Sequence, residues 1–218
     1  MSEEKLKGTL YDDQEAVKRF RDFENRYYQQ VTVTGVTGEC PYGHTEGEQY
    51  RVSNCNNGGL CGALYTSIHH SIVTLHYWGS LPWSKNPDTY LGMCPEMKVQ
   101  VEIRRMEQET RNLLKNQAQP RNMVGKGFPA IDKYRAFIEI LDVDKVCTWG
   151  HGAGQKLEID PFNCGDVCGF LYDKVYPYLN ILLAGVTLPW MSEDDRVMYQ
   201  ICPDSYNRTS YRLFLEER

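Results

Sequence analysis

The sequence predicts an α+β fold made of two tandem, pseudo-symmetric units, each with the element order ββαββ. Two observations predict this fold. The chain repeats itself at an offset of 107 to 108 residues, so that the stretch around Cys40 matches the stretch around Cys147. Within each unit, segments rich in β-branched and aromatic residues flank one segment whose apolar residues recur every three or four positions.

Several short motifs carry the repeat. "CPYGH" at 40–44 matches "CTWGH" at 147–151, and a glycine follows three residues after each histidine. "CGALY" then matches "CGFLY", "LPW" occurs in both units, and "CPE" matches "CPD". The chain therefore divides into an N-terminal helical extension (1–30), a first unit (31–107), a linker (108–133) and a second unit (134–218).

The elements of each unit follow in order. Each unit opens with a strand, "QVTVTGV" or "RAFIEILDV", and continues through a glycine-containing turn into a second strand, "EQYRVSN" or "QKLEID". The spacing predicts helices over 61–78 and 168–185, and Pro177 is expected to kink the second. The short strands "YLGMCP" and "VMYQICPD" contain the last cysteine of each unit, and "MKVQVEIRRM" and "SYRLFLEE" close the units.

Two further helices are expected outside the repeat. Residues 12–29 place Ala16, Phe20, Phe23 and Tyr27 on one face, which predicts an amphipathic helix that packs on the body or on a partner. Residues 104–118 also favour helix, which makes the linker partly helical.

The composition excludes several classes of function. The chain has 218 residues, 41% hydrophobic and 24% charged, and a net charge of -5, and it has no long basic run, so a nucleic-acid partner is not expected. The longest apolar run, 178–190, is too short to span a bilayer, so a membrane partner is not expected. No apolar signal core stands at the N-terminus, which predicts a cytoplasmic location.

All eight cysteines lie inside the two units, four in each. In a reducing compartment, thiols serve metal binding, redox chemistry or burial rather than structural disulfides. Three pairs align directly between the units, and the fourth is displaced by two residues. The aligned pairs are Cys40 with Cys147, Cys61 with Cys168 and Cys94 with Cys202, and the displaced pair is Cys55 with Cys164.

Thiolate and imidazole groups are good ligands for zinc and iron. Two ligand sets remain open in each unit. In one set, the histidine of the Cys-x-x-Gly-His motif and three cysteines bind the metal. In the other, the displaced cysteine is the fourth cysteine ligand, and the histidine stabilises the charge of a thiolate without binding the metal. The candidate metal ligands are Cys40, His44, Cys55, Cys61 and Cys94 in the first unit and Cys147, His151, Cys164, Cys168 and Cys202 in the second.

The cysteine spacing favours iron over zinc. Structural zinc sites usually contain paired Cys-x2-4-Cys knuckles, and here the pair Cys164 and Cys168 alone has that spacing. Cysteine followed by proline, at Cys40, Cys94 and Cys202, is typical of ferredoxin cluster motifs. An iron–sulfur cluster of the 4Fe–4S type is therefore expected, up to one in each unit, with zinc as the alternative cofactor.

Two readings without a metal stay open. The cysteines could be buried core residues that a duplication copied. Alternatively, Cys40 and Cys147 could act as nucleophiles activated by His44 and His151.

Other aromatic and histidine residues are assigned structural roles. His69, His70 and His76, which have no histidine counterparts in the second unit, are expected to be partly exposed helix residues. Trp83 and Trp190 of the two "LPW" motifs are expected to pack the end of each helix on its sheet.

With Cys-x-x-Gly-His-x-x-Gly, a Cys-Gly before a helix, Leu-Pro-Trp and Cys-Pro-Asp/Glu, each unit resembles a family of small, poorly characterised proteins of about ninety residues from anaerobic bacteria and archaea. The likeness covers 31–105 and 134–217. Some members carry two units, and the resemblance implies an anaerobic cytoplasm, where oxygen-sensitive clusters survive. The first unit departs from the second in its cysteine loop, "CNNGGLC" against "CGDVC".

These observations predict a metal-binding protein with one Cys/His-ligated centre per repeat, acting in anaerobic redox or cluster-assisted metabolism as an iron–sulfur oxidoreductase or lyase component. The alternatives are a cysteine-based enzyme without a cluster and a zinc-stabilised accessory subunit. The expected partners are a redox protein or an enzyme subunit, and the N-terminal helix offers a surface for homo-oligomerisation.

Overall fold

The computed structural model describes residues 18, 22–23, 26–107, 129–144, 146–191, 196–204 and 208–218. Within these residues the chain has a mixed α/β fold, as the sequence predicts. Its elements are β1 (Tyr27–Val36), β2 (Gln49–Val52), α2 (Gly62–His76), β3 (Thr89–Met93), β4 (Val99–Glu107), α3 (Ala130–Lys133), β5 (Tyr134–Asp142), β6 (Lys156–Ile159), α4 (Gly169–Leu183), β7 (Val197–Ile201) and β8 (Ser210–Glu217).

The strands form two four-stranded antiparallel sheets. Their strand orders are β2-β1-β4-β3 and β6-β5-β8-β7, so the first and last strands of each half lie side by side at the centre of its sheet. Both central pairs contain a register shift at the matching place, between Val33 and Gly35 and between Ile140 and Asp142. In β1 the side chains alternate between the two faces of the sheet. Val31 and Val33 are buried on the inward face, whereas Thr32 is half-buried and Thr34 is exposed.

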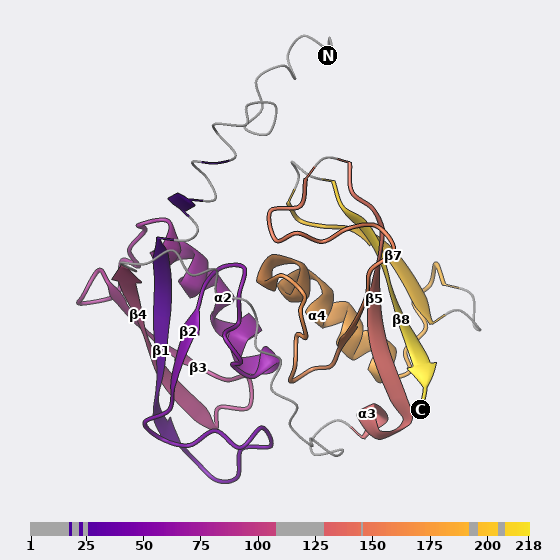
Figure 1. Ribbon diagram of the computed structural model, residues 1–218. Helices are drawn as coiled ribbons and strands as arrows, with labels where there is room; N and C mark the ends of the chain where they lie inside the picture. The colour runs from indigo at the N-terminus through magenta and orange to yellow at the C-terminus, as the bar shows by residue number, and fades with distance from the viewer. Residues whose placement is uncertain are drawn as a thin grey trace.

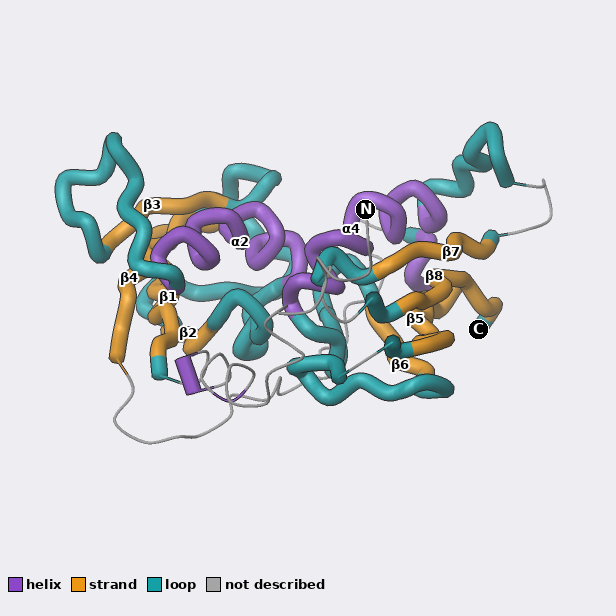
Figure 2. The backbone as a smooth tube through the Cα atoms, turned by 90° about the horizontal axis from the view of Figure 1, so that it is seen from above, coloured by secondary structure: helices purple, strands orange, loops and turns teal. Residues whose placement is uncertain are grey.

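One long helix packs against each sheet. In α2 the buried residues Leu64, Ile68, Ile72 and Leu75 follow three- and four-residue spacing and form one apolar stripe. α4 buries the same kind of stripe and continues through Pro177 to Leu183. The two helices meet in the middle of the molecule, with one sheet on each outer side (Figures 1 and 2).

The two halves are joined by a reciprocal pair of backbone hydrogen bonds. The amide of Gly62, the first residue of α2, donates to the Phe162 carbonyl at 2.7 Å, and the amide of Gly169, the first residue of α4, donates to the Cys55 carbonyl at 2.7 Å. The first amides of a helix have no hydrogen-bond acceptor within the helix, so each half supplies an acceptor carbonyl to the helix of the other half. The loop before each helix is thereby attached to the opposite half.

The helix predicted over 12–29 is confirmed at Lys18, Asp22 and Phe23, and the Phe23 ring stacks on the Tyr77 ring of the body. The end of this helix and the helix predicted over 104–118 need correction where the structure describes them. Tyr27 begins β1 rather than ending a helix, and most of the remaining range 12–29 lies outside the described residues. Residues 104–107 belong to β4, where they pair with β1, and the rest of 104–118 is not described. Strand pairing therefore overrides helix propensity at Arg104–Glu107.

The predicted roles of two histidines and two tryptophans are wrong. His69 and His76 are buried, with 4% and 0% exposure, because they lie on the inward face of α2, whereas His70 is exposed. Trp83 and Trp190 are 70% and 74% exposed, so they do not pack the helix ends on the sheets. No helix among the described residues is both long and apolar enough to cross a bilayer.

Candidate metal centre

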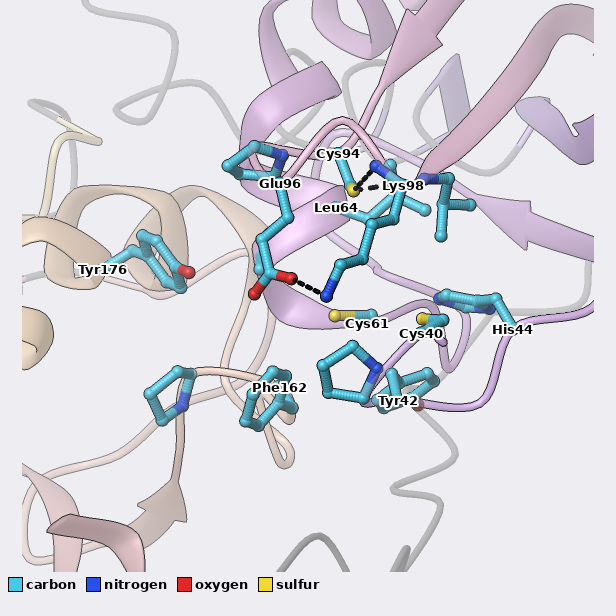
Figure 3. A pocket seen from close by; sticks show the side chains of 15 residues that line it. Cys40, Tyr42, His44, Cys61, Leu64, Cys94, Glu96, Lys98, Phe162 and Tyr176 are labelled. Carbon is cyan, nitrogen blue, oxygen red and sulfur yellow. Dashed lines mark hydrogen bonds and ion pairs between the residues drawn. The ribbon is translucent and has the colours of Figure 1, made fainter. Parts of the chain in front are cut away.

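Three cysteines that are far apart in the sequence line one cavity of about 140 Å³. Cys40, Cys61 and Cys94 lie in its wall together with His44 (Figure 3). The structure thus brings together four of the five residues predicted as ligands in the first unit. The second half also contributes to the wall, with Pro161, Phe162 and Tyr176.

Each of these cysteines stands at a point where the backbone turns. Cys40 opens a turn closed by the Gly43 amide, at 2.9 Å from the Cys40 carbonyl, and Gly43 has a φ of +81°, which glycine adopts without strain. Cys61 is the N-cap residue of α2. Cys94 opens the tight connection between β3 and β4.

Backbone amides point at the sulfur atoms. The amides of Lys98 and Val99 each donate to the Cys94 sulfur at 3.3 Å. Cys61 makes no side-chain cap hydrogen bond, but the nearby amides of Ala63 and Leu64 in the first turn of α2 oppose the rise in its pKa that burial causes. Such donors stabilise negative charge on sulfur, so they suit a thiolate that binds a cation.

The second half repeats this arrangement with Cys147, Cys168 and Cys202. The Gly150 amide closes the turn at the Cys147 carbonyl at 3.0 Å, and Cys168 is the N-cap residue of α4. Burial, and then negative charge on the other thiols, raises the pKa of Cys147 and raises that of Cys202 to about 12. The three thiols therefore lie within electrostatic reach of one another.

The two motif histidines have the same tautomer. His44 Nδ1 lies 3.1 Å from the Glu48 carboxylate and 2.9 Å from the Tyr50 hydroxyl, whose own proton goes to Glu48, so Nδ1 carries a proton. His151 Nε2 accepts the Cys168 amide at 3.2 Å, which leaves Nδ1–H to donate to Gln155 at 3.3 Å. His151 therefore orients the backbone at Cys168, whereas His44 lines the cavity.

Cys55 and Cys164 do not occupy matching positions. The hydrogen bonds donated by the Gly62 and Gly169 amides end at the carbonyls of Phe162 and Cys55, which makes these two residues counterparts. The matching glycine turns at Gly58 and Gly165 make Cys164 the counterpart of Asn57. Cys164 is fully buried, and its thiol lies 3.9 Å from the Gly165 carbonyl. The sequence pairs them as one position displaced by two residues, whereas the loop hydrogen bonds place them at two different positions of the repeat.

The described His, Cys, Asp and Glu residues contain no group of three or more placed to hold a single metal ion. A tetrahedral zinc site with Zn–S bonds of about 2.3 Å needs its sulfurs within about 4 Å of one another. A cluster distributes its cysteine ligands over several iron atoms and so accepts sulfurs that stand farther apart. Among the described residues, the cysteines of each set are therefore not arranged as a single-ion site.

A cation and an aromatic ring complete the first cavity. The Lys98 ammonium lies 2.9 Å from Glu96, and this hydrogen bond, followed by the nearby Cys40 and Cys94, raises its pKa. Tyr176 reaches the cavity from α4 (Figure 3). Sequence reasoning missed these residues: Lys98 lies only four positions after Cys94 and could have been noticed, but Tyr176 comes from the other half.

The environment of Cys147 does not support its predicted role as a nucleophile. A reactive thiolate needs a lowered pKa, yet burial raises the pKa of Cys147, and His151 directs its Nε2 to the Cys168 amide. The same burial raises the pKa of Cys61 to about 12. In the protein without metal these thiols are therefore protonated at neutral pH.

This protonation predicts a pH dependence of stability. Because the folded-state pKa of Cys61 lies above the ordinary value of 9.0, its contribution is complete below pH 9 and is lost as pH rises toward 12. The free energy of unfolding of the metal-free, reduced protein should fall as the pH rises past 9, with a slope from this group that steepens toward about 1.4 kcal/mol per pH unit. Urea unfolding at several pH values between 8.5 and 10 measures the slope, which should be shallower in the Cys61→Ala variant. A variant slope as steep as that of the unaltered protein would contradict the assignment to Cys61.

Comparison of the chain with protein-family models, with curated proteins and with solved structures finds no match.

Proposed function

We propose that this protein is a duplicated metal-binding protein that holds an iron–sulfur centre at each of its two cysteine sets and serves anaerobic electron transfer or a cluster-assisted reaction. The observation that carries the proposal is the convergence of Cys40, Cys61 and Cys94 on one cavity, with two backbone amides directed at the Cys94 sulfur. Amide donors and a neighbouring cation are what a thiolate-ligated cluster requires around it.

The alternative hypothesis, in which the cysteines are only buried core residues, accounts less well for these contacts. Cys40 and Cys94 are only partly buried and lie in turns beside the charged pair Lys98 and Glu96. Packing alone gives no reason for three thiols to meet a cation in a cavity. Cys164, in contrast, is fully buried and fits the core-filling reading.

When bound, a cluster would supply one-electron transfer or Lewis acidity at an iron atom. The chain would contribute the ligands and the charge balance. Lys98 offsets the negative charge of the Cys40 and Cys94 thiolates, while His44, fixed through Nδ1 by Glu48 and Tyr50, faces the same cavity. In the second set, His151 fixes the Cys168 backbone, which favours an all-cysteine ligand set there over one containing this histidine.

Purification without oxygen tests the proposal. We expect bound iron and acid-labile sulfide in similar amounts, and a broad visible absorption that dithionite bleaches. Zinc without sulfide would indicate the alternative cofactor. A colourless, metal-free protein that folds normally would overturn the proposal.

A further inference from the structure

Cys55 lies in the loop of the first half that is hydrogen-bonded to the second half. It belongs to the first half by sequence, yet its carbonyl accepts the amide of Gly169 at 2.7 Å. Gly169 directly follows Cys168, the N-cap residue of α4. The backbone of Cys55 is therefore attached beside the second cysteine set.

The equivalent residue of the other loop shows where a side chain at this position points. Phe162 stands 107 positions after Cys55, and its carbonyl accepts the Gly62 amide at the same distance of 2.7 Å. The backbone turns match as well, since the Ser53 amide donates to Asn56 at 2.8 Å and the Asp160 amide to Asn163 at 2.9 Å. Phe162 lines the cavity of Cys40, Cys61 and Cys94 (Figure 3).

Matching backbones give matching Cα–Cβ directions. Because Phe162 of the second half reaches the first cysteine set, Cys55 of the first half reaches the second set. The surroundings of Tyr65 are consistent with this direction: burial, followed by negative charge on Cys55, Cys168 and Cys164, raises its pKa, so Cys55 and Cys168 share one neighbour. That hydroxyl donates to the Asn54 carbonyl at 3.0 Å, next to Cys55.

Cys164 does not take this role in either half. It matches Asn57, whose side-chain amide donates to the Leu60 carbonyl at 2.9 Å inside the loop. Its own thiol is fully buried, and negative charge on it acts on Tyr172 of α4 as well as on Tyr65. It fills space under the loop.

We propose that Cys55 crosses between the halves and completes the second centre as its fourth cysteine ligand, together with Cys147, Cys168 and Cys202. This proposal rests on the proposed function. The first centre then has three cysteine ligands, and the ring of Phe162 takes the position that Cys55 has in the second centre. The two centres differ in kind: the second is fully ligated by cysteine, and the first keeps a position for His44 or for a ligand in the cavity.

The asymmetry gives each centre an expected task. Metal sites closed by protein ligands are structural or relay sites, whereas sites with an open position bind substrate. The first cavity has Lys98, Glu96 and Tyr176 in its wall, which are able to recognise a small polar ligand. The second centre would serve as the electron relay.

Metal retention tests the ligand assignment in full-length protein purified without oxygen. In a Cys40→Ser/Cys94→Ser background, which keeps only the second centre, Cys55→Ser should speed the loss of iron to a chelator at least about tenfold. Cys164→Ser is the matched control and should leave the rate unchanged. The reciprocal variant Phe162→Cys, in otherwise unaltered protein, should slow the loss of iron from the first centre.

A second measurement tests the geometry without any metal. In reduced, metal-free protein, dibromobimane should bridge Cys55 to Cys147, Cys168 or Cys202, as identified by peptide mapping. Bridging of Cys55 to Cys40, Cys61 or Cys94, or no bridge at all, would overturn the proposal whether or not the protein binds iron.

The two failures are distinguishable. If the chain binds no metal while Cys55 bridges to the second set, the proposed function is wrong and Cys55 is not a ligand, but the crossing of the loop stands. If iron binds and Cys164→Ser rather than Cys55→Ser releases it, the function stands and the assignment of Cys55 is wrong.

Discussion

Replacing Gly169 by valine is expected to destabilise the protein by about 2–3 kcal/mol. A Cβ atom at this position would overlap the Tyr65 hydroxyl and would lie 2.8 Å from the Asn54 carbonyl. Both neighbours belong to the first half, and the Tyr65 hydroxyl is itself held by the carbonyls of Ser53 and Asn54 at 2.8 and 3.0 Å. The side chain must therefore push the two halves apart, which equilibrium urea unfolding measures.

Two companion variants make this result specific. Gly152→Ala is the matched control, because a Cβ there meets nothing within 4 Å, and its stability should change by less than about 0.5 kcal/mol. Gly169→Val combined with Tyr65→Phe should cost less than the sum of the single changes, since removal of the hydroxyl relieves the overlap. Strict additivity of the two changes would contradict the contact between the halves.

Replacing Cys61 by serine should remove the first centre without unfolding the chain. Serine is a favourable N-cap residue, so α2 keeps its start, while the sulfur that Cys61 contributes to the cavity is lost. We expect iron and sulfide per chain to fall by about half, because the second set is intact. Elemental analysis together with the far-ultraviolet circular dichroism spectrum measures both parts of the expectation.

Cys164→Ser provides the comparison for this variant as well. Its thiol is fully buried beneath its loop, so the change should lower stability but leave the amount of iron unchanged. Equal losses of iron in Cys61→Ser and Cys164→Ser would show that the effect comes from weakened folding rather than from a lost ligand.

The sequence predicted the strands and long helices well because each has a clear period. β1 and β5 are rich in β-branched and aromatic residues, and α2 buries Leu64, Ile68, Ile72 and Leu75 at helical spacing. The sequence makes two overlapping predictions at 104–106: β4 confirms the closing strand over 97–106, whereas the helix over 104–118 is wrong at 104–107, because pairing with β1 is a long-range interaction. It failed at Trp83 and Trp190 for the same reason, since exposure depends on what packs nearby.

The candidate site was predictable in its members but not in its grouping. The repeated motifs single out Cys40, Cys61 and Cys94, and the structure places these three on one cavity. The fourth position could not be assigned, because Cys55 and Cys164 look like one displaced pair in the sequence. Their true counterparts, Phe162 and Asn57, follow only from the hydrogen bonds of the two loops.

By itself, the sequence determined a duplicated α/β chain with three pairs of cysteines at matching positions, because hydrophobic period, glycine turns and motif spacing are local properties. The tertiary structure decided which residues share a site, because the first amides of α2 and α4 find their partners in the opposite half. Those two bonds carry Phe162 to the first cysteine set and attach the backbone of Cys55 beside Cys168. Unpartnered helix amides must be satisfied from outside the helix, and only the folded chain specifies which loop satisfies them.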